Sequence, residues 1–185
     1  MPQSHRNLLR LIDLAKEPSS EKRRELLREV TDLFMEAPQD HSATQTEQFG
    51  DILGTVAREM EMEVRQTLAT RLASVPNAPH ALIVQLANDE INVARPVLTQ
   101  SVVLRDSDLI ALAKLQTQDH LHAIAGRKTV SAAVSDALVE RGDDRVLVRL
   151  ASNDGAELSR DAMEVLADKA ETVEPLRRPM VTRRR

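Results

Sequence analysis

The chain has 185 residues and a formal net charge of −4 at pH 7, so it has room for one well-buried domain or a short helical repeat. The absence of cysteine excludes disulfides and thiol catalysis. No apolar run in the sequence approaches the roughly 20 residues of a membrane span, and the N-terminus lacks the continuous apolar core of a secretory signal. We therefore expect a cytoplasmic protein.

Aromatic residues are almost absent. There is no Trp and no Tyr, and the two phenylalanines are Phe34 and Phe49. Strands favour aromatic and β-branched residues, whereas this chain favours Leu and Ala, which are good helix formers. The same shortage disfavours the stacking of bases or sugar rings on the protein.

The N-terminal part predicts two helices, over about 5–16 and 20–36, separated by Pro18. In both, apolar residues recur at helical spacing. The polar, non-periodic residues that follow are typical of a loop. We therefore expect an N-terminal helical hairpin over 1–37 and a linker over 38–46.

The remainder predicts a succession of short helices. Thr44 and Glu47 form a capping-box pattern before an apolar stripe that runs, with a break after Glu61, to about residue 72. Further helices are expected over about 80–88, 92–102, 107–115, 118–126, 130–141, 144–152 and 155–170. Asp154 with Glu157 suggests a capping box for the last of these helices. No period-2 strand pattern is present, so the expected class is all-α.

A helix-pair pattern returns along the chain. Leu86 and Ala87 precede Asp89 in one copy, and Leu150 with its following alanine precedes Asp154 in another. Helix pairs that recur at roughly 25–45 residues are the signature of an α-solenoid, in which each unit buries its apolar face against its neighbours. We expect Leu86, Leu112, Leu121, Leu138 and Leu150 in the shared core.

One stretch of sequence resembles a known family. The residues that carry the resemblance are Leu86, Ala87, Asp89, Val93, Ala94, Pro96, Val97, Leu98, Ser101, Leu104, Asp106, Asp108 and Leu109, continued by His120, Arg127, the run Leu138–Asp144, Asn153 and Ala156. They resemble an uncharacterised, mainly alphaproteobacterial family, a domain of unknown function regarded as HEAT-like. The resemblance covers about 47–170 and implies a HEAT-like repeat domain there. It brings no catalytic motif with it.

The chain has no recognisable catalytic or metal-binding motif. His120 and His122 are two residues apart, so they point to different sides of a helix and do not chelate one metal together. There is no HExxH, GxSxG or Gly-rich phosphate loop in the sequence. Carboxylates cluster at helix starts, where capping explains them. We expect no enzyme activity, no catalytic residue, no metal site and no cofactor.

Basic residues are the remaining candidates for a binding role. Arg65, Arg95 and Arg127 are expected on or just after the second helices of the pairs, where a HEAT-like superhelix has its concave side. With His120 they form the predicted partner-binding set, because arginines there are suited to gripping acidic groups. The alternative is that each arginine covers an apolar neighbour or pairs with a nearby carboxylate. Residues 171–185 are expected to form a flexible basic tail.

Three function classes follow from these patterns. The leading hypothesis is a non-catalytic protein-interaction scaffold or regulatory adaptor that binds a partner protein in a solenoid groove. The alternatives are a nucleic-acid-binding HEAT-like protein and an enzyme without recognisable motifs. The net charge of −4 disfavours nucleic acid, because phosphate binding needs a dominant positive face. The identity of the partner and the oligomeric state remain open.

Overall fold

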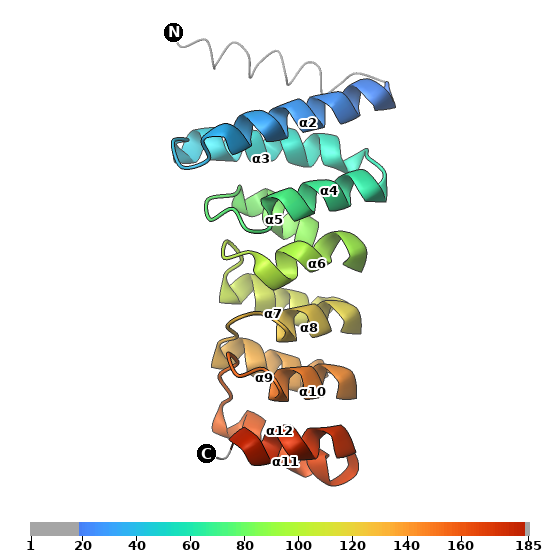
Figure 1. The fold of residues 1–185 in the computed structure, drawn as a ribbon, viewed down its shortest axis with the longest axis vertical. Helices are drawn as coiled ribbons and strands as arrows, with labels where there is room; N and C mark the ends of the chain where they lie inside the picture. Colours follow the sequence, from blue (N-terminus) through green and yellow to red (C-terminus); the bar gives the residue numbers. More distant parts are fainter. Residues whose placement is uncertain (1–18, 184–185) are drawn as a thin grey trace. The chain divides into compact units, whose positions relative to one another are not determined.

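The computed structural model describes residues 19–183, and over that range the protein is all-helical with no β-strand (Figure 1). The all-α prediction is therefore confirmed. The helices are α2 (Ser20–Glu36), α3 (Ala43–Arg58), α4 (Met62–Leu72), α5 (His80–Ala87), α6 (Ile91–Gln100), α7 (Asp106–Leu115), α8 (Gln118–Ala125), α9 (Ala132–Arg141), α10 (Asp144–Ala151), α11 (Arg160–Thr172) and α12 (Glu174–Arg183). The helix predicted over 5–16 lies outside the described residues.

The chain divides into two compact units near the end of α6. The first unit runs up to Val97 and includes Ser101–Val103, and the second takes Leu98–Gln100 and everything from Leu104 onward. The boundary predicted from sequence at the 38–46 linker does not coincide with this division. Instead, α2 packs against α3 within the first unit.

An aromatic cluster joins α2 to α3. The ring of His41 stacks on Phe34 with centroids 5.3 Å apart, and Phe49 approaches His41 to 4.9 Å. Ser42 begins α3 through a capping box with Gln45, two residues earlier than the predicted pair, because the Ser42 hydroxyl accepts from the Gln45 N–H at 3.3 Å. The predicted linker is thus largely a tight turn followed by the first turn of α3.

Two glycines allow α3 to lie close to the following segment of the first unit. A Cβ added at Gly50 would lie 2.6 Å from Cβ of Pro79, and one at Gly54 would lie 3.0 Å from Oε1 of Gln85. The Gln85 amide uses this approach to donate to the Gly54 carbonyl at 3.1 Å. A larger residue at Gly50 would therefore push the start of α5 away from α3, and one at Gly54 would displace the Gln85 side chain.

In the second unit the helices contact one another in two series. The first helices of successive pairs meet, α7 with α9 and α9 with α11. The second helices also meet, α8 with α10 and α10 with α12. Each helix therefore buries its apolar stripe against both its partner in the pair and its counterpart in the next pair.

The ends of the second helices are tied together by side-chain donors. Arg127 follows α8 and donates through Nη1 to the carbonyl of Leu98, near the end of α6, at 2.6 Å. Asn153 follows α10 and donates to the carbonyls of Ala125 and Arg127, at the end of α8, at 2.9 and 2.7 Å. The last carbonyls of a helix have no partner inside it, so each contact satisfies groups that the helix leaves open.

Arg183 makes the same contact at the end of α12. Its guanidinium donates to the carbonyls of Ala151 at 2.7 Å and Ala156 at 2.9 Å, and also to that of Asn153. Leu176 and Met180 of α12 are buried, being 0% and 5% exposed. The prediction of a flexible tail over 171–185 is therefore wrong for Glu174–Arg183, because two apolar anchors and one arginine hold this basic segment as a helix.

The start of α11 differs from the prediction for a related reason. Val130 and Ala156 form an isolated parallel bridge, in which Val130 donates to Gly155 at 3.0 Å and accepts from Glu157 at 2.8 Å. This pairing holds residues 155–157 out of a helix. Consequently α11 begins only at Arg160, capped by Ser159, and the Asp154–Glu157 capping box is wrong.

The five predicted core leucines are all buried, with exposed fractions of 2% or less. We expect Leu138→Ala in α9 to lower the free energy of unfolding by about 2–5 kcal/mol, because it leaves a cavity in a packed core. Urea denaturation followed by circular dichroism measures this change. Leu115→Ala is the control, because Leu115 is 78% exposed and its truncation should change stability by less than about 0.5 kcal/mol.

Candidate functional site

Arg65 makes its contacts inside the first unit. Its Nε and Nη2 donate to the two carboxylate oxygens of Asp89 at 2.6 and 2.9 Å, and Nη1 donates to the carbonyl of Met60 at 2.7 Å. The hydrogen bond to Asp89 raises the pKa of Arg65 against the opposing effect of burial. With side chains only 16% and 17% exposed, this pair ties α4 to the turn between α5 and α6.

Arg127 and His120 also make internal contacts, both in the second unit. Burial lowers the pKa of the Arg127 guanidinium, and the nearby Asp106 carboxylate partly opposes this shift. His120 is only 3% exposed, and its Nδ1 lies 2.8 Å from Oγ1 of Thr117. Neither side chain offers its polar groups freely to an incoming partner.

Arg95 is the one member of the predicted set with an exposed side chain, on α6. Its part in partner binding stays a prediction. For Arg65 and Arg127 the contacts favour the alternative interpretation, in which an arginine stabilises the fold through a carboxylate or carbonyl acceptor. The four residues therefore have different environments.

The second unit has a hollow that lies mainly on the second helices of its pairs, α8, α10 and α12. It has a volume of about 700 Å³, and we call it the C-terminal groove. It is lined by His122 of α8, by Asp144, Arg145, Val148 and Arg149 of α10, by Ser152, by Thr172 of α11, and by Val173, Glu174 and Pro175 around the start of α12. Apolar side chains and charges of both signs therefore face one open space.

Arg149 is the exposed guanidinium of this groove. A Cβ added at Gly126 would lie 2.9 Å from both Nε and Nη2 of Arg149, so the guanidinium rests on the bare backbone at the C-terminal end of α8. A cation is stabilised there by the partial negative charge of the helix end. Within the part of the chain that the structure describes, Arg149 has no hydrogen-bonding or ion-pairing acceptor.

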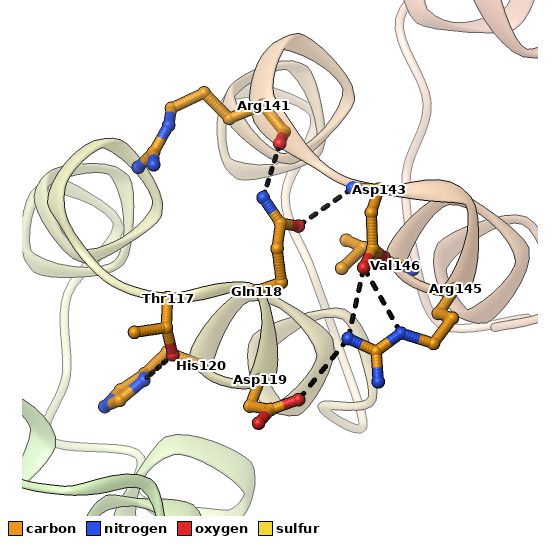
Figure 2. A network of polar contacts seen from close by, with 8 residues as sticks. All are labelled: Thr117, Gln118, Asp119, His120, Arg141, Asp143, Arg145 and Val146. Atoms are coloured by element: carbon orange, nitrogen blue, oxygen red, sulfur yellow. Dashed lines mark hydrogen bonds and ion pairs between the residues drawn. The ribbon is translucent and has the colours of Figure 1, made fainter.

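A polar network lies at the starts of α8 and α10 (Figure 2). The Gln118 side chain donates to the carbonyl of Arg141 at 2.9 Å and accepts from the Asp143 N–H at 2.8 Å. Arg141 in turn donates to the carbonyl of Ala113, near the end of α7, at 2.8 Å. These hydrogen bonds hold the connection between α9 and α10 against the connection between α7 and α8. They thereby fix the position of the start of α10.

Arg145 is held by carboxylates within this network. Its guanidinium contacts Asp143 at 3.1 Å and Asp119 of α8 at 3.5 Å. Asp143 also caps α10 by accepting from the Val146 N–H at 3.0 Å. Burial alone would raise the pKa of Asp143, but the hydrogen bonds from Val146 and Arg145 lower it more. Of the two groove arginines, only Arg149 is left available for an added acid.

The first unit has a smaller hollow between α2 and α4. It has a volume of about 490 Å³ and is lined by Glu21, Arg24, Glu25, Leu27, Arg28, Thr31, Val64, Thr67, Leu68 and Arg71. Two of its arginines are paired: Arg24 with Glu61, just before α4, and Arg71 with Asp32 at 2.7 Å. This N-terminal groove also lies on the second helices of the predicted pairs.

Residues 19–183 contain neither a metal-binding cluster nor a helix that could span a membrane. Over this range no three His, Cys, Asp or Glu side chains gather as a metal site would require. None of the helices described combines the length and the apolar character that crossing a bilayer demands.

The helices define the part of the chain that the structure describes as an all-α protein. The family described as an uncharacterised protein conserved in bacteria (DUF2336) matches residues 93–185, just over half of the chain. The chain belongs to this family, and the matched region contains every residue that lines the C-terminal groove. No curated protein matches the chain, and no solved structure matches it.

Arg149 is not among the residues that the sequence patterns predict for partner binding. The same criterion that singled out Arg65, an arginine on a second helix, applies equally to Arg149 on α10. What the sequence does not display is the acceptor: Asp89 lies 24 residues beyond Arg65, whereas Arg149 rests on a glycine backbone. A glycine at the end of the preceding second helix, Gly126, was the available signal.

We expect Arg65→Ala to lower the free energy of unfolding by about 1–3 kcal/mol, because it leaves the half-buried Asp89 carboxylate without its main donor. Thermal and urea denaturation measure the loss. Arg160→Ala is the control: Arg160 is 89% exposed and pairs with Glu164 at 2.9 Å, a kind of pair worth about 0.5 kcal/mol or less. Equal effects of the two substitutions would contradict the role assigned to Arg65.

Asp143 should make stability depend on pH in the acid range. Its folded-state pKa is lowered, so its ionised form stabilises the fold above the unfolded value of about 3.9. That contribution is lost as pH falls through the folded pKa. Asp143→Asn, which keeps an acceptor for the cap, should be less stable than wild type at pH 7, and the difference should shrink below about pH 4. Unfolding measured from pH 7 to pH 2 tests this, and a difference that grows on acidification would contradict it.

Proposed function

We propose that this protein is a non-catalytic adaptor that holds a segment of a partner protein in the C-terminal groove. We further propose that its helix pairs stack as a short HEAT-like solenoid. The contacts between successive first helices and between successive second helices of the second unit support this stacking. Solenoids of this kind typically use the surface made by one series of helices for recognition.

The composition of the groove supports protein binding. Val148, Val173 and Pro175 offer apolar surface, and Arg149 and Glu174 offer charge. Protein interfaces usually combine apolar surface with polar and charged groups in this way. Arginine is also among the residues most enriched at binding hot spots. The observation that carries the proposal is the open C-terminal groove, which contains the exposed Arg149 and lies within residues 93–185, the part matched by the family.

Site-specific photocrosslinking tests the proposal. Benzoylphenylalanine placed at Ser152, an exposed groove position, should give a discrete protein adduct in a lysate of the bacterium that encodes the chain. Placed at Arg160 on α11, which is exposed and outside the groove, it should give none. A discrete adduct is expected because an adaptor holds its partner within reach of one face.

Two outcomes would overturn the proposal. Adducts that are equal from both positions would show that the groove is not the recognition surface. An adduct at Ser152 that disappears on nuclease treatment would favour the nucleic-acid alternative. Circular dichroism of both variants ensures that a lost adduct is not caused by unfolding.

A further inference from the structure

The direction of the second helices decides how charge is distributed along the C-terminal groove. Asp119 and Arg145 meet near the starts of α8 and α10, and Gly126 and Arg149 meet toward their ends. Arg183 likewise brings the end of α12 to the end of α10. The three helices therefore run in the same direction, with their starts at one side of the second unit and their ends at the other.

The acidic end of the groove lies at the helix starts. Asp144 is in the first turn of α10, and Glu174 is in the first turn of α12. Both carboxylates are exposed and make no ion pair with another residue that the structure describes. Arg145, the nearest cation of the groove in sequence, is already engaged by Asp119 and Asp143. This end therefore attracts a cation.

The basic end lies toward the helix ends. Arg149 is five residues after Asp144, which corresponds to roughly 7 Å along the axis of α10. The packing of its guanidinium on Gly126 restricts the side chain before any ligand arrives, and this lowers the entropic cost of binding. The Nε and Nη2 edge of the guanidinium faces Gly126, so a carboxylate would bind at the other edge, formed by Nη1 and Nη2, with two parallel hydrogen bonds.

We propose, resting on the function proposed above, that the groove selects a partner segment with a specific charge order. A carboxylate side chain of the segment meets Arg149, and a cationic side chain placed roughly 7 Å further along the α10 axis meets Asp144 and Glu174. An apolar side chain between them covers Val148 and Val173. The occupant is thus a dipolar protein segment, and opposite charges at the two ends of the groove fix its direction of binding.

Selection from a random 12-residue peptide library displayed on phage tests this inference. Peptides selected on the full 185-residue chain should share an Asp or Glu and a Lys or Arg on either side of an apolar residue. Synthetic copies should bind about tenfold or more weakly to Arg149→Glu than to wild type, because the contact becomes repulsive. Selection on Arg149→Glu should return peptides with Lys or Arg in place of the acid.

Two controls separate this inference from the proposed function. Arg160→Glu reverses an exposed charge outside the groove and should leave peptide affinity unchanged. Ser152→Trp narrows the groove without adding a charge at either end and should weaken every peptide that binds there. Peptides that lose affinity with Ser152→Trp but not with Arg149→Glu would overturn the charge order and leave the groove function standing. Selected peptides insensitive to both variants, or no selected peptide, would overturn both.

Discussion

Open carbonyl groups at helix ends are the constraint on which the second unit depends. An α-helix leaves its last four carbonyls without intrahelical partners, and short helices of eight to ten residues, such as α8 and α10, spend a large share of their polar groups in this way. Here a donor from the next pair supplies the missing hydrogen bond: Arg127 for the end of α6, Asn153 for the end of α8 and Arg183 for the end of α10. The end of each of these helices is thus completed by a residue about 30 positions further along the chain.

This arrangement also determines the geometry of the C-terminal groove. Donors at one end of the second helices fix α8, α10 and α12 in a common register, and the network of Gln118, Asp143 and Arg145 fixes the starts of α8 and α10. The backbone then places the side chains that face solvent between these two sets of contacts. Arg149 is one of them, and its guanidinium also packs against Gly126, so a fold made of short helices presents a defined groove.

Helix existence could be read from the sequence because it depends on local patterns. The predicted ranges at 80–88 and 118–126 agree with α5 (His80–Ala87) and α8 (Gln118–Ala125) to within a residue at each end. The structure departs from the sequence-based predictions where contacts distant in sequence override the local pattern. Pairing of Val130 with Ala156 delays the start of α11. The α12 segment looked like a basic tail because its stabilisation depends on Arg183 reaching carbonyls about 30 residues earlier.

The dependence on contacts distant in sequence also explains why the sequence does not separate structural arginines from arginines available for binding. A carbonyl acceptor belongs to every residue, so nothing in the sequence marks Leu98 as the partner of Arg127. The sequence alone therefore does not distinguish an arginine that donates to the carbonyls at a helix end from one whose guanidinium has no internal acceptor. The distinction between them is physical: Arg127 loses water and gains an internal acceptor, whereas Arg149 keeps its exposure and rests on a glycine. Arginines of the second kind retain hydrogen-bonding capacity, so the binding residues of the proposed adaptor are best sought among side chains that the helix-end contacts leave unused.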